Sequence, residues 1–242
     1  MKSIHFKTID STSSYLKRNH EKYRNYTFVS CDFQTDGHGR MARKWYSNPK
    51  ENLLFSVLIK DKKLIKKFSS LSLASACAIH NILTKYKVSN VTIKWPNDVF
   101  VNDNKIAGIL LESISNGPEI DVLVVGIGIN VNQTKFEEDL IHKPTSIYIE
   151  KSKKVNPKIF KYVVYKEIIK TFNKIKKDDN SYLSIVKNNN YLLNKEVYAE
   201  INNSSEIVKV VGINDDNTLK VVNNNRYYNL SFGEITFHKK NL

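Results

Sequence analysis

The sequence predicts an α+β protein, a mixed, largely antiparallel sheet with flanking helices, followed by a small SH3-like β-barrel. Three observations indicate this fold class. Apolar residues recur at helical spacing near 68–86 and 157–175. Residues 91–131 contain β-type runs separated by short turns, which is the pattern of an antiparallel meander. After residue 190, short β runs follow one another closely, as in a small barrel.

Four elements are expected in the first 90 residues. They are, in chain order, a helix over 11–19, a strand over 26–33, a strand over 53–59 and a helix over 68–86. Asp10, Ser11 or Thr12 can cap the first helix. The glycine-bearing segment 37–44, between the two strands, is expected to be a loop.

The middle of the chain is expected to be a meander that leads into a long helix. β-type runs at 91–95 and 122–131 flank a strand pair that turns around residues 102–104. A further turn is predicted at Asn116 and Gly117. Asn156 and Pro157 match the cap and the first position of a helix that runs to about Ile175.

The character of the sequence changes after Asn190. Five short β runs are separated by Asn, Asp, Ser and Gly turns, at 197–201, 207–213, 219–222, 227–230 and 235–237. We therefore expect two domains, a larger one over residues 1–190 and a barrel over residues 191–242.

Composition excludes several classes of protein. A chain of 242 residues with 41% hydrophobic residues is long enough for one sizeable core and a small module. It contains no run approaching the roughly 18 apolar residues of a membrane helix, and Met1–His5 lacks the apolar stretch of a signal peptide. Cys31 and Cys77 have no metal or redox spacing. A cytoplasmic protein without a metal-ligand cluster or a membrane partner is expected.

The net charge of +14 is compatible with nucleic-acid binding, but its distribution argues against it. Lysines are spread along the whole chain and accompany asparagines, as in residues 187–190. Nucleic-acid patches usually cluster and include exposed aromatic side chains. A solvated surface is the first interpretation, attraction to an acidic protein is the second, and specific DNA binding is the third.

Two segments carry cations in positions that suit an anionic ligand. In the run Lys94-Trp95-Pro96-Asn97-Asp98, a lysine at the end of a strand is followed by a proline-stiffened turn, so it is held as a fixed charge. The segment 34–45 combines permissive glycines with Arg40 and Arg43, so its amides can approach an anion that the arginines neutralise.

Glycines elsewhere admit a structural or a functional interpretation. Gly37, Gly39 and Ala42 match the dinucleotide-binding fingerprint, but residues 45–49 do not continue as the helix that this fingerprint requires. Gly108 and the glycines of the run 126–130 lie inside predicted strands. Such glycines commonly mark a bulge or a ligand close to the backbone.

Taken together, five segments resemble the biotin protein ligases. They are Ile9-Asp10-Ser11-Thr12-Ser13, the glycine loop from Gln34 to Trp45, Lys94 to Asp98, Lys105 to Glu112, and Gly126 to Val131. Phe232-Gly233-Glu234-Ile235 is similar to the C-terminal signature of that family. The resemblance implies a class II synthetase-like biotin/lipoate ligase fold. It also implies a two-step reaction, in which biotin and ATP form biotinyl-5′-AMP and the biotin then passes to a lysine of a carrier domain. Mg²⁺ is implied as well.

The resemblance also implies roles for individual residues. Lys94 and Arg40 would be catalytic, with Lys94 bridging the biotin carboxylate and the α-phosphate. The implied biotin-binding residues are Ser11, Thr12, Ser13, Gln34, Gly37, His38, Gly39, Arg40, Lys94, Gly108 and Gly126. The implied ATP-binding residues are Arg40, Arg43, Trp45, Lys94, Lys105 and Asn130, the last reading adenine through its amide.

The chain departs from the family pattern at several positions. His38 stands where well-known bacterial members have arginine, and Met41 and Ala42 replace a basic residue and a glycine. His238 occupies a position where some relatives direct an arginine at ATP. Because ten residues precede Ser11, the short form without a DNA-binding domain is expected. Its partner would be the biotin carboxyl carrier protein of acetyl-CoA carboxylase or a related biotin-dependent carboxylase, and the enzyme would be a monomer or a homodimer.

Two alternatives stay open. A lipoate ligase or octanoyltransferase shares the same fold, and Cys31 near the glycine loop is the one candidate for an acyl-accepting thiol, although no activating base neighbours it in the sequence. A basic nucleic-acid-binding module with a terminal barrel is the second alternative. It leaves the runs 94–98 and 126–130 without a purpose.

Overall fold

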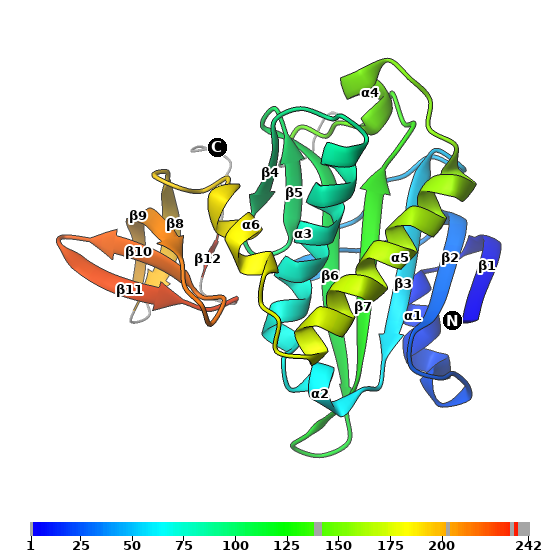
Figure 1. The fold of residues 1–242 in the computed structure, drawn as a ribbon, viewed down its shortest axis with the longest axis horizontal. Helices are drawn as coiled ribbons and strands as arrows, with labels where there is room; N and C mark the ends of the chain where they lie inside the picture. The colour runs from blue at the N-terminus through cyan, green and yellow to red at the C-terminus, as the bar shows by residue number, and fades with distance from the viewer. Residues whose placement is uncertain (1, 138–141, 202–203, 233–234, 237–242) are drawn as a thin grey trace.

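The computed structural model describes residues 2–137, 142–201, 204–232 and 235–236, which form two sheets with helices packed mainly on the larger one (Figure 1). The larger sheet has the order β1-β2-β3-β7-β6-β5-β4. Its strands are β1 (Lys2–Ile9), β2 (Thr27–Gln34), β3 (Asn52–Ile59), β4 (Val91–Lys94), β5 (Asp98–Val101), β6 (Asn104–Ser115) and β7 (Ile120–Asn130). β1 and β2 are parallel and the other pairs are antiparallel, so the predicted mixed, largely antiparallel sheet is confirmed.

Helices cover both faces of this sheet. The helices are α1 (Thr12–Asn19), α2 (Lys62–Ile65), α3 (Phe68–Lys85), α4 (Ile147–Lys151), α5 (Pro157–Lys176) and α6 (Tyr182–Asn188), with short 3₁₀ turns at His20–Lys22 and Arg40–Ala42. In Figure 1, α3 and α5 cross the front of the sheet, while α1 lies behind it. None of the described helices is both long and apolar enough to cross a membrane.

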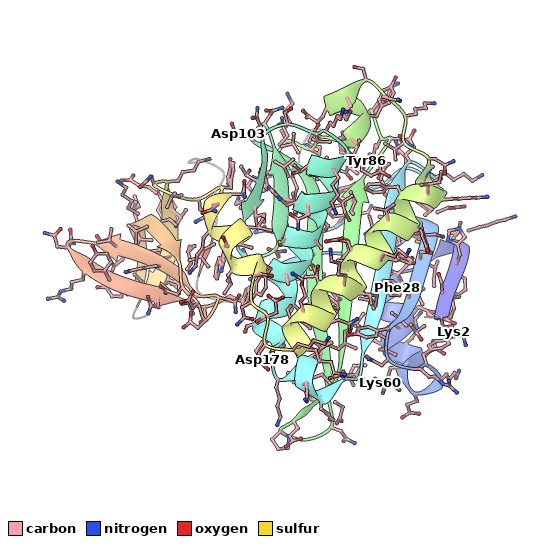
Figure 2. All side chains as sticks on the ribbon, viewed as in Figure 1. Lys2, Phe28, Lys60, Tyr86, Asp103 and Asp178 are labelled. Atoms are coloured by element: carbon pink, nitrogen blue, oxygen red, sulfur yellow. The ribbon has the colours of Figure 1, made fainter. Side chains whose placement is uncertain are left out.

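Each face has its own packed core. On the α5 face, Phe28 is fully buried and stacks on Tyr165 with ring centroids 4.1 Å apart, and Figure 2 places it beside that helix. On the α1 face, Leu16 packs with Val29 and Leu58. Both faces of β3 are therefore covered by packed side chains, which explains why all eight of its residues are buried.

The capping residues act as the sequence predicts. Ser11 precedes α1 and accepts a hydrogen bond from the backbone N–H of Ser14. Asn156 accepts from two backbone N–H groups at the start of α5, with Pro157 at the first helical position. The β5–β6 hairpin turns at Asn102 and Asp103, both with positive φ, a conformation that Asn and Asp tolerate.

Several elements were not predicted. These are β1, α2, α4 and α6. β1 has three apolar residues, Ile4, Phe6 and Ile9, among five polar or charged ones, because it is an edge strand with much of its length exposed. The three helices have seven residues or fewer, which is too short for an apolar period to repeat.

The second sheet is antiparallel and has the order β11-β10-β9-β8-β12. Its strands are β8 (Glu196–Ile201), β9 (Ser204–Ile213), β10 (Leu219–Asn223), β11 (Arg226–Leu230) and β12 (Ile235–Thr236). Within the described residues, no pairing joins β11 to β12, so this part forms an open five-stranded sheet. The boundary near residue 190 stays a prediction. Gly233, Glu234, Phe237 and His238, which the sequence analysis also used, lie outside the described residues.

The C-terminal sheet is attached to the larger one through Trp95. The Trp95 side chain is 1% exposed and stacks on Phe232, with ring centroids 5.3 Å apart and planes 7° apart. Its indole N–H donates to the carbonyl of Asn217 at 2.9 Å. The Asn217 side chain in turn accepts from the Tyr182 hydroxyl and donates to Ser70. A buried polar network therefore surrounds this aromatic contact.

Candidate active site

A cavity of about 380 Å³ lies on the α1 face of the larger sheet. Strand register explains its position. Leu54, Gly128, Gly108 and Asp98 are successive partners across β3, β7, β6 and β5, and Asp98 then pairs with Lys94 on β4. These residues share one face of the sheet, since paired residues point the same way. Two adjacent glycines in this row leave a trough in the middle of the sheet.

The ring of Trp45 fills part of that trough. A Cβ atom on Gly128 would lie 2.5 Å from the Trp45 ring, and one on Gly108 would lie 3.0 Å from it and 3.2 Å from the Lys105 side chain. Lys105 Nζ lies 5.6 Å from the ring centroid. Gly108 was expected to leave room for biotin. In the structure, the space that its missing side chain leaves is occupied by Trp45 and Lys105.

Hydroxyl and amide groups form one end of the cavity. Gln34 Oε1 accepts from both the backbone N–H and the hydroxyl of Thr12, at 2.8 Å and 3.0 Å. Ser56 bonds to Thr12 at 2.8 Å and to Ser13 at 2.9 Å. Because each hydroxyl has one hydrogen, the donors run from Ser13 to Ser56 to Thr12 to Gln34. This direction leaves the Ser13 oxygen able to accept a hydrogen bond.

Lys94 lies at the β4 end of this row of paired residues, and its side chain is 2% exposed. Its Nζ is 2.8 Å from Nε2 of His142 and lies over the rings of Phe100 and Tyr191. Burial lowers the pKa of this amine to about 7. The sequence predicted a fixed charge at this position. In the structure the amine is buried, and its pKa of about 7 means that its protonated and neutral forms are both populated near neutral pH.

Arg40 connects the glycine loop to two other parts of the chain. Its guanidinium donates to Asn97 Oδ1 at 3.4 Å and to the backbone carbonyl of Phe232, in the segment between β11 and β12. Burial lowers the pKa of Arg40. The loop itself closes through a hydrogen bond of 2.7 Å from Gly39 N to the carbonyl of Arg43. It contains a single 3₁₀ turn where the sequence suggested only a loop.

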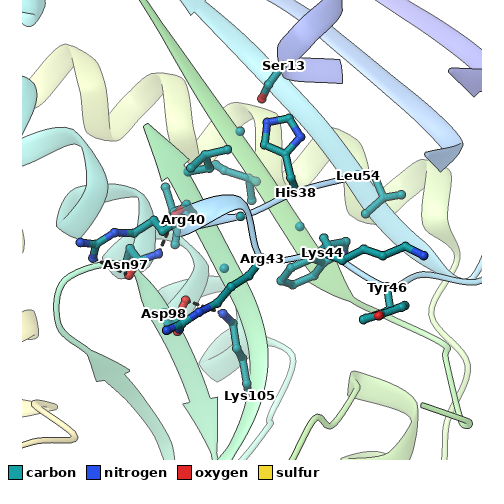
Figure 3. Close-up of a pocket in the computed structure, with 18 of the residues that line it drawn as sticks. Ser13, His38, Arg40, Arg43, Lys44, Tyr46, Leu54, Asn97, Asp98 and Lys105 are labelled. Carbon is teal, nitrogen blue, oxygen red and sulfur yellow. Dashed lines mark hydrogen bonds and ion pairs between the residues drawn. The ribbon is translucent and has the colours of Figure 1, made fainter. Parts of the chain in front are cut away.

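Further cations gather around Asp98. Lys105 Nζ lies 2.8 Å from an oxygen of this carboxylate, and Figure 3 shows Arg43 beside the pair. In the same view, Ser13 and His38 lie at the far end of the cavity. His38 Nε2 is 3.8 Å from Glu112 and its Nδ1 is 3.2 Å from the carbonyl of Asp36. The cavity therefore has a hydroxyl end and a cationic end.

Every residue that the sequence analysis placed in the site lines this cavity except Gly37. Gly37 is buried beside it, where a Cβ atom would lie 2.7 Å from the Gln34 amide nitrogen. In the structure, Gly37 makes room for the Gln34 side chain, and its role in biotin binding stays a prediction.

The structure adds lining residues that the sequence analysis did not assign. The polar ones are Lys44, Tyr46, Ser56, Asn97, Asp98 and His142. Asn97 and Asp98 stand in the same run as Lys94, so proximity in the sequence was the available signal. Ser56 lies in an apolar strand where a single serine is unremarkable, and His142 lies in a loop without a motif. Only the fold brings these two into the cavity.

Three buried polar atoms of the described residues that line the cavity have no hydrogen-bond partner. They are the indole N–H nitrogen of Trp45, Oδ1 of Asn130, and Oδ1 of Asp98, which is ion-paired with Lys105. The Asn130 amide nitrogen donates to the carbonyl of Thr145 at 2.9 Å, which fixes the orientation of the amide. A buried donor or acceptor without a partner costs roughly 1–3 kcal/mol. A ligand that supplies these partners would recover that free energy.

The cysteine considered as an acyl acceptor does not line the cavity. Cys31 is 4% exposed, and burial with the nearby Asp32 raises the pKa of its thiol to about 12. A thiol with such a pKa is not a nucleophile at neutral pH.

Comparison with known proteins gives the family. The family model described as "Biotin/lipoate A/B protein ligase family" matches residues 5–130, which is more than half of the chain. The chain is 33% identical over 175 residues to the bifunctional ligase/repressor BirA of Bacillus subtilis, covering 70% of this chain and 53% of that protein. It is 36% identical over 100 residues to the biotin--[acetyl-CoA-carboxylase] ligase of Paracoccus denitrificans, covering 40% of this chain and 41% of the relative.

A solved structure covers more of the chain. The biotin protein ligase from Aquifex aeolicus in complex with biotin and ATP superimposes with a TM-score of 0.86 at 28% identity, over 98% of both chains. In contrast, the chain spans about half the length of the curated relatives that it matches. The family match, the full-length fold match and a cavity lined by the residues of the family's motifs agree, and the chain therefore belongs to the biotin/lipoate A/B protein ligase family.

Proposed function

We propose that the protein is a biotin protein ligase, which joins biotin and ATP into biotinyl-5′-AMP and then transfers biotin to a lysine of a carrier domain. The observation that carries this proposal is one continuous cavity with a hydroxyl end and a cationic end. Biotin has a polar ureido ring at one end and a carboxylate at the other. The first end needs hydrogen-bond partners and the second needs positive charge.

The hydroxyl end has the groups that a ureido ring requires. The ring offers two N–H donors and one carbonyl acceptor, and the Ser13 oxygen is left as an acceptor by the bonds among Thr12, Ser56 and Gln34. The lipoyl and octanoyl groups of the competing substrates end in apolar atoms, which would leave these polar groups unpaired. A site that hydrogen-bonds its ligand rejects such analogues strongly.

The first reaction needs positioning and charge neutralisation rather than a protein nucleophile. The biotin carboxylate attacks the α-phosphorus of ATP, the bond from this phosphorus to the bridging oxygen breaks, and pyrophosphate leaves with the electron pair. Lys94, protonated in the presence of two anions, would contact the carboxylate and the α-phosphate. Arg40, Arg43 and Lys105 would neutralise phosphate oxygens. Asn130 would meet adenine, whose amino group can supply the missing partner of Oδ1.

The side chains of the cavity fit Mg²⁺ only if the ion is bound mainly by the phosphates of ATP. The described residues contain no group of three or more metal-ligating acidic, histidine or cysteine side chains. Asp98 is the one carboxylate among the described residues that line the cavity. In nucleotide sites, Mg²⁺ is commonly held by one or two carboxylates, water and substrate phosphates. Asp98 would hold it, and the bound ion would neutralise phosphate charge.

In the second reaction, the acceptor lysine would attack the acyl carbon as a neutral amine. The bond from this carbon to the AMP oxygen would break, AMP would leave with the electron pair, and the new amide would lose one proton to water. The Paracoccus denitrificans relative is named for acetyl-CoA carboxylase. We therefore propose the carrier domain of that carboxylase as the acceptor. The net charge of +14 would favour the approach of an acidic carrier.

The proposal is tested by incubating the protein with ATP, Mg²⁺ and each of three acids, biotin, lipoate and octanoate. Pyrophosphate exchange that depends on biotin alone is the expected result. Exchange driven by lipoate or octanoate would replace the proposal with the competing ligase. Tight, salt-resistant binding to one duplex over scrambled competitors, without any exchange, would support a nucleic-acid module instead.

Substitution of Gly126 is expected to weaken biotin binding without unfolding the protein. A Cβ atom there would lie 2.6 Å from the Ser13 oxygen, so Gly126→Ala forces this hydroxyl to rotate away from Ser56. The affinity for biotin, measured by titration calorimetry, should fall about tenfold. The reason is the loss of one hydrogen bond between neutral groups, from the ureido ring to the Ser13 oxygen, and of shape complementarity around it. Gly212→Ala is the matched control, because its Cβ would meet nothing within 4 Å. Equal affinities of the two variants would contradict the proposed position of the ureido ring.

Removal of Arg40 is expected to release the reactive adenylate. Its guanidinium ties the loop to Asn97 and to Phe232, so Arg40→Gly frees the loop that covers the phosphate. Biotin labelling of serum albumin in the presence of ATP should rise about tenfold, while biotin affinity changes little. Arg24→Gly, at an exposed position, serves as the control. Unchanged albumin labelling by an Arg40→Gly protein that still forms the adenylate would show that Arg40 does not retain the intermediate.

A further inference from the structure

His142 is a titratable side chain in the cavity that the proposed function leaves without a role. It lies between β7 and α4, and its Nε2 is 2.8 Å from Nζ of Lys94. Its ring packs edge-on against Phe100, with centroids 5.3 Å apart and an interplanar angle of 74°. The ring is therefore held in a defined orientation toward the amine.

The protonation state of His142 decides what it can do for Lys94. Burial, and then the charge of Lys94, lower the pKa of His142 to about 4. The imidazole is therefore neutral at physiological pH, with one N–H and one lone pair. A protonated lysine can only donate, so Nε2 must accept from it and the ring hydrogen must sit on Nδ1.

The surroundings of Lys94 decide when it is protonated. Burial lowers its pKa to about 7 in the ligand-free protein. Among the charged groups that face it, Asp98 raises the pKa, and the cations that lower it are Lys105, Lys195 and Arg43. A carboxylate and a phosphate bound beside the amine favour its charged form. Lys94 is thus an ammonium group in the complex with both substrates.

We propose that His142 is a positioning residue for Lys94, an inference that rests on the proposed function. The neutral imidazole accepts one of the three ammonium hydrogens and thereby fixes the rotation of the group about its last bond. With its rotation fixed, the ammonium group would donate to the carboxylate and to the α-phosphate in set directions. Donors held in place before the reaction lower its barrier more than donors that must first be ordered.

The test uses two variants at position 142 and one beside it. His142→Gln keeps a hydrogen-bond acceptor, and His142→Leu removes it at similar volume. Lys143→Gln is the matched control, because its side chain is exposed and does not line the cavity. Biotin-dependent pyrophosphate exchange gives kcat and the KM for biotin from pH 6 to 9, and circular dichroism checks that each variant is folded.

The expected result separates positioning from packing. In His142→Leu, kcat falls about tenfold and the KM for biotin changes less than twofold. Lys94 still attracts the biotin carboxylate in this variant, but the rotation of its ammonium group is no longer fixed. The alkaline limb of kcat/KM, which reports the free enzyme, lies near pH 7 in the wild type and moves to lower pH in this variant. His142→Gln recovers most of kcat and the position of the limb. Lys143→Gln matches the wild type in both.

Two results would overturn the inference. One is a wild-type kcat and alkaline limb in His142→Leu. The other is an equal loss in the Leu and Gln variants, which would indicate packing alone. The ¹⁵N shifts of the His142 ring in the ligand-free protein at pH 6 give an independent readout, and a hydrogen found on Nε2 would also overturn it. Absence of biotin-dependent exchange in the wild type would reject the proposed function instead, and the ¹⁵N spectrum would still decide the tautomer.

Discussion

Replacement of Lys94 by methionine is expected to reduce biotin-dependent pyrophosphate exchange by a hundredfold or more. In the complex, its ammonium group would face two anions whose charge is redistributed during the reaction. Loss of one such positioned donor in a site shielded from water costs about 3 kcal/mol of transition-state stabilisation. The rate should fall at saturating biotin and ATP, since the interaction strengthens in the transition state.

Lys195→Met is the matched control for this experiment. Lys195 also lies near the site, over the Tyr191 ring at 3.4 Å, but it does not line the cavity. Its removal should change the rate by less than threefold. A Lys94→Met protein that is folded and exchanges pyrophosphate at the wild-type rate would remove Lys94 from the reaction.

The same variant has an expected effect on stability that depends on pH. Folding lowers the pKa of Lys94 from 10.5 to about 7, so between these values the unfolded chain binds one more proton than the folded protein. The stability of the wild type therefore rises with pH across this window, relative to Lys94→Met, which lacks the group. Thermal unfolding at pH 7 and at pH 9 should show a larger gain for the wild type. Equal gains in both proteins would contradict the lowered pKa.

Trp95→Ala is expected to lower the melting temperature by about 6–20 °C. The side chain is 1% exposed and joins the two sheets, so its loss leaves a cavity beside Phe232 and removes the hydrogen bond to Asn217. Truncation of a buried aromatic side chain costs about 3–5 kcal/mol, and each kcal/mol shifts the melting temperature by roughly 2–4 °C in a protein of this size.

Differential scanning calorimetry measures this effect, with Tyr227→Ala as the control. Tyr227 is an aromatic residue of the C-terminal sheet that is 66% exposed, so its removal should change the melting temperature by about 2 °C or less. Trp95→Phe should recover part of the loss, because it keeps an aromatic ring against Phe232 but not the indole N–H. A Trp95→Ala protein with the melting temperature of the wild type would mean that this contact does not hold the sheets together.

Local signals in the sequence were sufficient for the elements that bury a regular apolar face. The helix that begins after Asn156 was predicted because Pro157 and the apolar period agree with each other. The hairpin at Asn102 and Asp103 was predicted because these residues accept positive φ. The edge strand β1 was not predicted, since its partner β2 and its position at the edge, rather than its own composition, make it a strand.

Site residues that belong to a sequence motif could be predicted, whereas those that only the fold brings to the cavity could not. Lys94 and Arg40 belong to runs that resemble a known family. Ser56 and His142 come from a buried strand and a loop, and no local pattern distinguishes them from residues elsewhere. Gly37 lies beside the cavity rather than in its lining, because a glycine in a motif can make room for a neighbouring side chain as easily as for a ligand.

The two edges of the larger sheet differ in what they offer to an incoming strand. On the outer side of β4, Ile93 donates its backbone N–H to Asn189 and accepts from Tyr191, at 2.8 Å and 2.9 Å. The chain itself thus occupies that edge. At the opposite edge, β1 pairs with β2 on one side, and much of its length is exposed, with Lys2 and Lys7 among its residues. Among the described residues, β1 is therefore the edge of the larger sheet that is open to a further strand, and an acidic strand would meet favourable charge there.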